Sequence, residues 1–358
     1  MPDTSLESLQ AASFHEEEPP MTIMEFLSKF PFSDEKSAID YYIKIRYGGV
    51  LVCPHCRAAV NVYRYRNRQK ACHCKNCNNS FSPFSGTIFE KSTTPLWKWF
   101  YAIYLFPDSR KGFAACHLQR KIDVTYKTAW RMLHQLRIAM QNGELKHFEG
   151  LVEMDETYFG GKPRKSPPKL YDPETYSESK KLTTGRGTMK PTIAGIKERK
   201  SGRVYTQVMP PNKAGKKVTG PQLYDVINKT CVSGTAVITD EFPSYRILDR
   251  PYKPKVDLSL LDDSEPASSL PVRRFGHHKV CHKRYEWVAG ATKDGELIHT
   301  NGIESHWAII KRSYYGVYHF ISKKYLPRYL GEYDFRQNTR KLPDPDVFDL
   351  LLKQSVLK

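Results

Sequence analysis

Two pairs of cysteines constrain the fold of this chain more than any other feature of its sequence. Cys53 and Cys56 form one C-x2-C pair, and Cys74 and Cys77 form a second pair 17 residues later. This spacing is typical of a structural zinc site. Four thiolates close a tetrahedral site and leave no open position, so we expect this zinc to build a ribbon fold and to do no chemistry. The alternative is a chance spacing of unbound cysteines.

The stretch between the two pairs is basic and aromatic. Tyr and Arg alternate in its YRYRNRQK segment, which favours a hairpin with a basic face for phosphates. Cys72 and His73 lie beside the second pair and could compete as ligands, although Cys74 fits the spacing better. Eight cysteines in 358 residues do not indicate a disulfide scaffold.

The charge of the chain predicts a polyanionic partner. Lys and Arg number 56 against 38 acidic residues, which gives a net charge of +18 in a chain that is 40% hydrophobic and therefore able to fold. DNA or RNA is the first candidate and an anionic membrane surface the second. Because no apolar run approaches the length of a membrane span and no signal peptide is evident, we expect a soluble intracellular protein. Its place would be the cytoplasm or nucleoid of a bacterium, or the nucleus of a eukaryote.

Helix-capping residues, glycines and shifts in composition along the chain predict its division into segments. Thr22 and Glu25 fit a capping box, and a second helix is expected from Ser33 to the Gly48-Gly49 pair. The expected segments are an acidic disordered tail at 1–20, N-terminal helices at 21–49, the zinc ribbon at 50–90, a helix-turn-helix region at 91–145, an α/β catalytic core at 146–340 with a loop insertion near 251–271, and a C-terminal helix at 341–358.

The region after the ribbon reads as helices. An aromatic helix is expected within Phe89–Phe106, and Phe113–Arg120, a turn and a helix from Thr125 to about Met140 form a helix-turn-helix pattern. The last helix has one apolar and one basic face. Its buried stripe is expected to contain Tyr126, Ala129, Trp130, Leu133, Leu136 and Met140, and its DNA-facing side Lys127, Arg131 and His134. The alternative is a helical bundle whose charges are only solvated.

The stretch VEMDETYFGG, residues 152–161, reads as a strand that carries acids. Alternation places Glu153, Asp155 and Thr157 on one face and the apolar residues on the other. A carboxylate on a buried strand is costly unless it is paired or binds a metal, so Asp155 needs a partner from elsewhere in the chain. The alternative is a half-exposed edge strand with a solvated acidic face.

The second half of the chain alternates strands and helices. The short apolar strand AVITD ends on Asp240, a second candidate metal ligand, and a helix begins at Asn301. Three strands, a helix, a strand and a final helix follow the order of a ribonuclease-H-like mixed sheet, in which the first and fourth strands are central neighbours. The remaining strands are expected at Lys190–Lys197, Arg203–Met209 and His278–Val288, and the first helix at Gln222–Lys229. Asp155 and Asp240 could then hold two Mg²⁺ or Mn²⁺ ions, which cut and transfer phosphodiesters when roughly 3.5–4 Å apart.

These pieces together resemble a known family, the zinc-ribbon insertion-sequence transposases of the ISXO-like group, related to the Merlin elements of animals. The matching segments span roughly residues 50–338: CPHC, CKNC, FSPFSGTIFEKSTTPLWKWF, KTAW, DETYFGGK, ITDEFPSY and HTNGIESHWAIIKRSYYGVYHFISKKYLPRYLGEYDFRQN. The resemblance implies a DNA transposase that binds terminal inverted repeats, cuts the transposon ends and joins them to target DNA. It also implies an Asp-Asp-Asn or Asp-Asp-Glu active site that begins with Asp155 and Asp240.

The third catalytic residue stays open between two positions. Relatives with Asn point to Asn301 and those with Glu to Glu304, and the negative charge of Glu304 would bind Mg²⁺ more strongly. The alternative is that Asn301 caps the helix with Glu304 as its capping-box partner. Lys311 lies two turns after Glu304 and, with Arg312, is expected to bind DNA phosphate. Because two ends must be joined, a homodimer or larger assembly on double-stranded DNA is expected.

Other residues have more ordinary expectations. His277, His278, Cys281 and His282 match no standard metal spacing. Cys116 and Cys231 are expected in the core. The aromatic run Trp307, Tyr314, Tyr315, Tyr318 and Phe320 is expected to pack in the core rather than to stack on a base. The rival functions are a domesticated DNA-binding regulator that no longer cuts, and a metal-dependent nuclease or resolvase.

Overall fold

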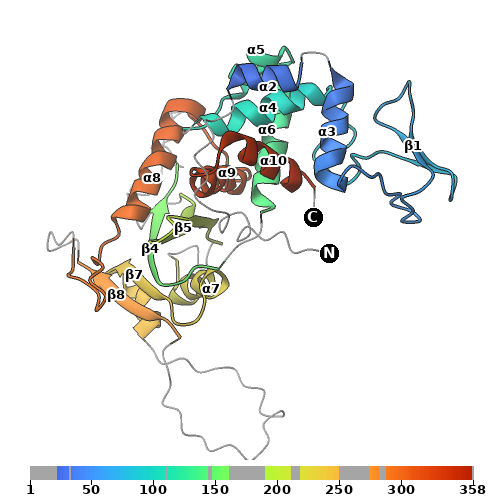
Figure 1. Cartoon of the computed structure of the whole chain (residues 1–358). Helices are drawn as coiled ribbons and strands as arrows, with labels where there is room; N and C mark the ends of the chain where they lie inside the picture. The colour runs from blue at the N-terminus through green and yellow to red at the C-terminus, as the bar shows by residue number, and fades with distance from the viewer. Residues whose placement is uncertain are drawn as a thin grey trace, which may run out of the picture. The chain divides into compact units, whose positions relative to one another are not determined.

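The computed structural model describes residues 22–31, 34–109, 111–143, 147–160, 190–210, 218–249, 274–281 and 288–356. The expected acidic tail at 1–20 and loop insertion near 251–271 lie outside these residues, as does His282. By their contacts the described residues form two compact units. The first contains the residues up to Gly143 together with those from Thr339 onward, and the second contains the residues between them (Figure 1).

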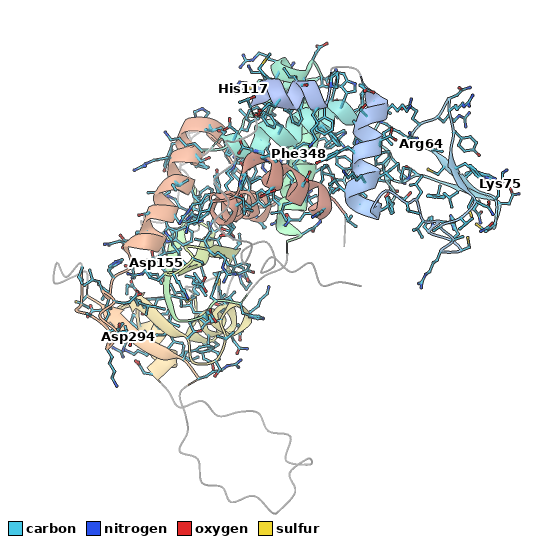
Figure 2. All side chains as sticks on the ribbon, in the orientation of Figure 1. Arg64, Lys75, His117, Asp155, Asp294 and Phe348 are labelled. Atoms are coloured by element: carbon cyan, nitrogen blue, oxygen red, sulfur yellow. The ribbon has the colours of Figure 1, made fainter. Side chains whose placement is uncertain are left out.

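Aromatic side chains form the core of the first unit. Phe348 lies against Phe26, Phe30 and Phe100, with ring centroids 5.2–5.8 Å apart. The C-terminal helix therefore packs among helices from the start of the chain, as the label on Phe348 shows in Figure 2. The helices of this unit are α2 (Ile23–Lys29), α3 (Glu35–Tyr47), α4 (Leu96–Asp108), α5 (Ala115–Ile122), α6 (Tyr126–Gln141) and α10 (Asp344–Gln354). The capping box between Thr22 and Glu25 is confirmed.

A small antiparallel sheet in the order β1-β2-β3 carries the cysteine pairs. Its strands are β1 (Val62–Arg64), β2 (Cys72–Cys74) and β3 (Asn79–Phe81). Ion pairs join this hairpin region to α3: Arg64 lies 2.6 Å from Asp40, and Lys70 lies 3.1 Å from Glu35. Glu35 also accepts a hydrogen bond from the backbone N of Leu96 (2.6 Å) and so caps α4, whose own N-cap residue is a proline.

A three-residue turn joins α5 to α6. Asp123 ends α5 in the left-handed region with a φ of 48°, a conformation that Asp tolerates better than most residues. Thr125 begins α6, and its Oγ1 accepts a hydrogen bond from the backbone N of Thr128 (3.2 Å). The expected pair of helices around a turn through Asp123 is therefore present.

The second unit contains a mixed five-stranded sheet in the order β6-β5-β4-β7-β8. Within this sheet β5 pairs in antiparallel fashion with both β4 and β6, and β4, β7 and β8 run parallel to one another. The strands are β4 (Leu151–Tyr158), β5 (Thr192–Glu198), β6 (Val204–Val208), β7 (Ala236–Asp240) and β8 (Gly276–Val280). The last strand begins two residues before the predicted start at His278 and ends at Val280, before the predicted end at Val288, because charged residues interrupt the alternation in this stretch.

Helices cover both faces of this sheet (Figure 1). On one face Val152, Met154 and Ile196 pack with α7 (Gly220–Thr230) and the 3-10 helix η2 (Pro243–Asp249). On the other face Ile193 packs with α8 (Asn301–Ser313), the π-helical turn η5 (Tyr314–Tyr318) and α9 (Leu326–Thr339). The predicted α/β class with a mixed sheet is confirmed. The acid-bearing face of β4 is the one that α8 covers.

Candidate active site

Two central parallel strands carry the two aspartates. β4 pairs with β7 so that Glu153 lies opposite Ile238. The same offset of 85 residues, continued two positions along both strands, brings Asp155 beside Asp240 on one face of the sheet. Because β4 is paired on both sides, with β5 and with β7, it is not an edge strand. The alternative of a solvated acidic edge is wrong.

The carboxyl group of Asp155 lies in an unfavourable place for a negative charge. Its pKa is raised to about 7, first by burial and then by the charges of Asp240 and Glu304, while a hydrogen bond from Trp307 acts in the opposite direction. The carboxyl group of Asp155 is thus under the influence of two other carboxylates, one on the neighbouring strand β7 and one on α8. Hard oxygen donors whose charges repel in this way fit a divalent cation, which would compensate all three.

The first turn of α8 holds both candidates for the third ligand. Thr300 is the N-cap and Asn301 is the first helical residue, so the alternative in which Asn301 caps the helix is wrong. The side chains of Asn301 and Glu304 are both exposed. Glu304 accepts a hydrogen bond from Thr300 Oγ1 (3.4 Å), and its charge acts on Asp155. Of the two residues, Glu304 is the one whose charge acts on Asp155.

Trp307 orients Asp155, a role that the sequence did not indicate. Its Nε1 donates a hydrogen bond to Asp155 Oδ2 (3.0 Å), and its ring is 4% exposed. Gly195 lies directly opposite Asp155 on β5, and a Cβ there would come within 2.5 Å of the Trp307 ring. A glycine at this position therefore provides the space that lets the indole reach across the sheet. Gly195 could have indicated the position of the Trp307 ring only if the pairing of β4 with β5 had been known.

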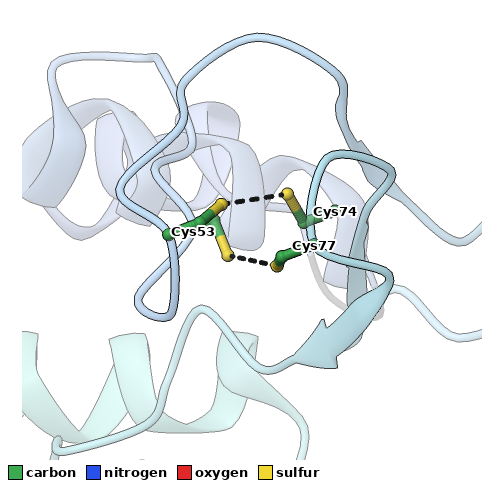
Figure 3. A group of neighbouring side chains, drawn as sticks. Cys53, Cys74 and Cys77 are labelled. Carbon is green, nitrogen blue, oxygen red and sulfur yellow. Dashed lines mark hydrogen bonds between the residues drawn. The ribbon is translucent and has the colours of Figure 1, made fainter.

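The four predicted cysteines form the zinc centre of the first unit (Figure 3). The Sγ atoms all lie within 4.8 Å of one another, with 3.6 Å between Cys53 and Cys77 and between Cys56 and Cys74. A tetrahedral zinc with Zn–S bonds of about 2.3 Å requires Sγ separations of about 3.8 Å, so the site fits zinc. Within the described ranges this is the one group of three or more His, Cys, Asp or Glu gathered this closely, and Cys72 does not belong to it.

Comparison with known proteins gives family matches over the segments that contain both sites. The ISXO2-like transposase domain matches residues 147–258 and 268–338, and the transposase zinc-ribbon domain matches residues 33–80. The chain belongs to the ISXO2-like transposase family. The transposase is also 28% identical, over 335 residues, to an uncharacterized protein in transposable element ISH50 of Halobacterium salinarum. That alignment covers 91% of this chain and 98% of the relative.

The basic residues predicted to bind DNA are exposed. On α6 of the transposase Lys127 and Arg131 are exposed, as are Lys311 and Arg312 on α8. His134, in contrast, is 2% exposed and packs against Trp130 with ring centroids 4.1 Å apart, so its prediction as a DNA-facing residue is wrong.

Four residues that were predicted to be buried are exposed: Tyr126, Cys116, Tyr315 and Phe320. Tyr126 is 54% exposed because it occupies the first position of α6, before the helix enters the core. Cys116 is exposed because α5 buries only Leu118 and Ile122. Cys231 is buried as predicted. In the aromatic run, Trp307 and Tyr314 are in the core, whereas Tyr315 and Phe320 are exposed because they follow the change from α-helix to π-helix.

His277 is part of a hydrogen-bond network, and among the residues that the structure describes it belongs to no close group of metal-binding side chains. Its Nδ1 lies 2.8 Å from Asp249 Oδ1, and its Nε2 lies 2.9 Å from Thr239 Oγ1. Burial lowers the pKa of His277, which favours the neutral ring. Across the described residues of the transposase, we find no helix with the length and apolarity needed to cross a membrane.

Proposed function

We propose that this chain is a DNA transposase that cuts the ends of its element and joins them to target DNA at one acidic site. The observation that carries the proposal is the convergence of Asp155, Asp240 and Glu304. Burial, and then the charges of Asp240 on the neighbouring strand and Glu304 on the covering helix, raise the pKa of the Asp155 carboxyl group. A DNA-binding regulator or a purely structural sheet has no need for such a costly arrangement.

The sheet order supports a ribonuclease-H-like core. Numbered by their order in the chain, the five strands lie across the sheet as 3-2-1-4-5. The first and fourth of them, β4 and β7, are parallel neighbours at its centre. This is the arrangement that would bring Asp155 and Asp240 together across 85 residues of sequence. The order, the parallel pair and the acids at its carboxyl end agree with one another.

The carboxylates would hold two divalent cations, Mg²⁺ or Mn²⁺. Bound there, the cations would lower the pKa of the attacking water or hydroxyl and stabilise charge on the leaving 3′ oxygen. Asp155, fixed by its hydrogen bond from Trp307, would hold the cations together with Asp240 and Glu304. Water first attacks the phosphodiester at the transposon end and releases a 3′-OH and a 5′-phosphate. The 3′-OH then attacks a target phosphodiester, so no covalent bond to the protein is needed.

The first unit would recognise the terminal inverted repeats. Its zinc ribbon and the turn-linked helices α5 and α6 present exposed Tyr63, Lys127 and Arg131. Phosphate contacts from such residues fix the register of the protein on DNA, and Lys311 and Arg312 would hold the backbone near the acids. A homodimer or larger assembly would bring two ends together.

The proposal is tested with a DNA fragment that carries the gene's own flanking sequences. In Mg²⁺ the full chain is expected to cut at the element ends and to join the 3′ ends to a target plasmid. Tight binding of the flanks without cutting, in Mg²⁺ and in Mn²⁺, would favour the regulator. Cutting without joining would favour a nuclease or resolvase.

Alanine substitutions should identify the third ligand. Glu304→Ala is expected to lower cleavage on the order of 10³-fold, the cost of removing one electrostatic stabiliser of the transition state. Asn301→Ala is expected to lower it less than about tenfold, because the charge that acts on Asp155 remains. Single-turnover cleavage in Mn²⁺ measures both. The opposite ranking would assign the role to Asn301, and full cleavage by both variants would exclude the pair.

Removing the basic face of α6 should change the salt dependence of binding. The double variant Lys127→Ala, Arg131→Ala is expected to reduce the slope of log K against log salt by about 1.8, or about 0.9 for each lost phosphate contact. Fluorescence anisotropy between low and physiological salt measures this slope. Lys200→Ala removes an exposed charge at the end of the sheet opposite to Asp240 and is the matched control. An unchanged slope in the double variant would exclude this face from the DNA interface.

A further inference from the structure

Glu153 is a buried carboxylate that the proposed chemistry does not use. It is 1% exposed and lies on the same face of β4 as Asp155, two residues earlier. Arg199 Nη2 lies 2.8 Å from Glu153 Oε1, and His299 Nδ1 lies 3.5 Å from the same atom. The backbone N of Ile303 donates a hydrogen bond to Oε2 (2.8 Å). Both carboxylate oxygens are therefore occupied by protein groups.

The partners of Glu153 tie the start of α8 to the centre of the sheet. Ile303 is in the first turn of the helix, where an anion is favoured by the free backbone N–H groups and the helix dipole. Lys197, which pairs with Glu153 across β4 and β5, donates to the carbonyl of Gly302 (3.0 Å). Arg199 Nη2 donates to the carbonyl of His299 (3.0 Å). Charged side chains from β4, from β5 and from just beyond β5 thus hold the first turn of α8 and His299, the residue before its N-cap.

Gly302 allows this close contact. A Cβ at position 302 would lie 2.6 Å from Glu153 Oε2 and 2.9 Å from Oε1, closer than side chains tolerate. The carboxylate and the helix backbone therefore occupy adjoining space, with no room for a side chain between them. A larger residue at 302 would lift the first turn of α8 away from β4 or displace the carboxylate.

We propose that Glu153, through its contact with the α8 backbone at Gly302 and Ile303, is the positioning residue that sets the distance from Glu304 to Asp155. Glu304 directly follows Ile303, and Asp155 follows Glu153 by two residues on one strand face. The hydrogen bond from Ile303 and the steric contact at Gly302 thus connect β4, which carries Asp155, to α8, which carries Glu304. Arg199 neutralises the buried charge, so Glu153 is not free to bind a cation. The inference rests on the proposed function, because it concerns the same three acids.

The test measures cation binding separately from DNA cleavage. The midpoint of the Mn²⁺-induced rise in melting temperature is recorded for the full chain, with MnCl₂ as the only added ligand. Glu153→Gln, which keeps size and shape, is expected to raise this midpoint by about 10-fold or more, the usual cost of losing a residue that orients metal ligands. Cleavage at saturating Mn²⁺ should then stay within about tenfold of the original chain.

Two outcomes would overturn the proposal. If Glu153→Gln loses the Mn²⁺ response completely and cuts at no Mn²⁺ concentration, as expected of Asp155→Asn, then Glu153 is itself a ligand. If the Mn²⁺ midpoint is unchanged and only the metal-free melting temperature falls, its role is structural. Because the melting response needs no DNA, a chain that binds Mn²⁺ but never cuts would contradict the proposed function without affecting this inference.

A double-mutant cycle gives a second, independent readout. Gly302→Ala alone is expected to raise the Mn²⁺ midpoint by about tenfold, because its methyl group meets the Glu153 carboxylate. In a Glu153→Ala background the same change should have little further effect, since the obstructing atoms are gone. Gly316→Ala is the matched control, because a Cβ at Gly316 meets nothing within 4 Å. Additive effects of the two substitutions would overturn the proposal even if Glu153→Gln failed to fold.

Discussion

Asp155→Asn is expected to leave the transposase able to bind its DNA ends but to lower cleavage by at least about 10³-fold. Asn keeps the size of the side chain and can still accept the hydrogen bond from Trp307. It removes the charge that two cations would share. End binding by gel shift and Mg²⁺-dependent cleavage, measured on the same DNA fragment, separate the two effects.

The same variant should be more stable than the original chain in the absence of metal. Asp155 is buried beside Asp240 and Glu304, so its charge costs folding free energy until a cation compensates it. A gain of 1 kcal/mol corresponds to about 2–4 °C in melting temperature for a unit of this size. Asp294→Asn, an exposed aspartate labelled apart from Asp155 in Figure 2, should change neither stability nor cleavage. Retained cleavage in Asp155→Asn would remove Asp155 from the active site.

Loss of zinc should abolish recognition of the element ends while leaving the catalytic unit folded. The strands of the ribbon are only three residues long, so we expect the metal to supply most of its folding free energy. Cys74→Ser, or treatment with a zinc chelator, is expected to weaken end binding by about 10³-fold or more, the difference between specific and non-specific association. Zinc content per chain and DNA affinity are the measurements.

Neighbouring cysteines provide sharp controls for this prediction. Cys72→Ala removes a thiol beside the zinc ligands but outside the cluster, and Cys116→Ser changes an exposed thiol on α5. Both variants should retain one zinc per chain. A chain that keeps its zinc in Cys74→Ser but loses it in Cys72→Ala would show that the ligand is Cys72, two positions earlier on the same face of β2.

The main elements of both sites could be predicted because each has a local signature. The cysteine spacing identifies the zinc ligands without any knowledge of the fold. The alternation in VEMDETY indicates a strand with an acidic face, and the apolar run before Asp240 indicates a buried strand. The pairing of these two strands followed from the order of strands and helices along the chain. Parallel neighbours in such a sheet bring their carboxyl ends together.

The residues that support the acids could not be predicted, because their roles depend on register. Gly195 is unremarkable in the sequence and acquires its role only because it lies opposite Asp155, under the Trp307 ring. Likewise, Glu153 looked like part of a solvated or metal-binding acidic face. Its burial follows from Arg199, which lies one residue beyond the strand that pairs with β4.

His134 shows where a helical wheel fails. The periodicity of α6 separates one apolar stripe from the remaining positions, and His134 falls outside that stripe. In the structure α6 contacts α4, α5 and α10, so more of its circumference is buried than one stripe can cover. The third of these neighbours comes from a part of the sequence more than 200 residues away and leaves no local signal.

The return of α10 to the first unit has a consequence for how the chain is made. Phe348 completes a ring cluster with Phe26, Phe30 and Phe100, and Asn142 donates hydrogen bonds to the carbonyls of Gln354 and Val356 (3.2 and 2.9 Å). During synthesis these N-terminal helices emerge early but lack their last partner until residue 356 has left the ribosome. The catalytic unit, whose residues are contiguous, can fold before then. The unit expected to hold DNA is thus the last to be finished, and no fragment that ends before α10 should reproduce it.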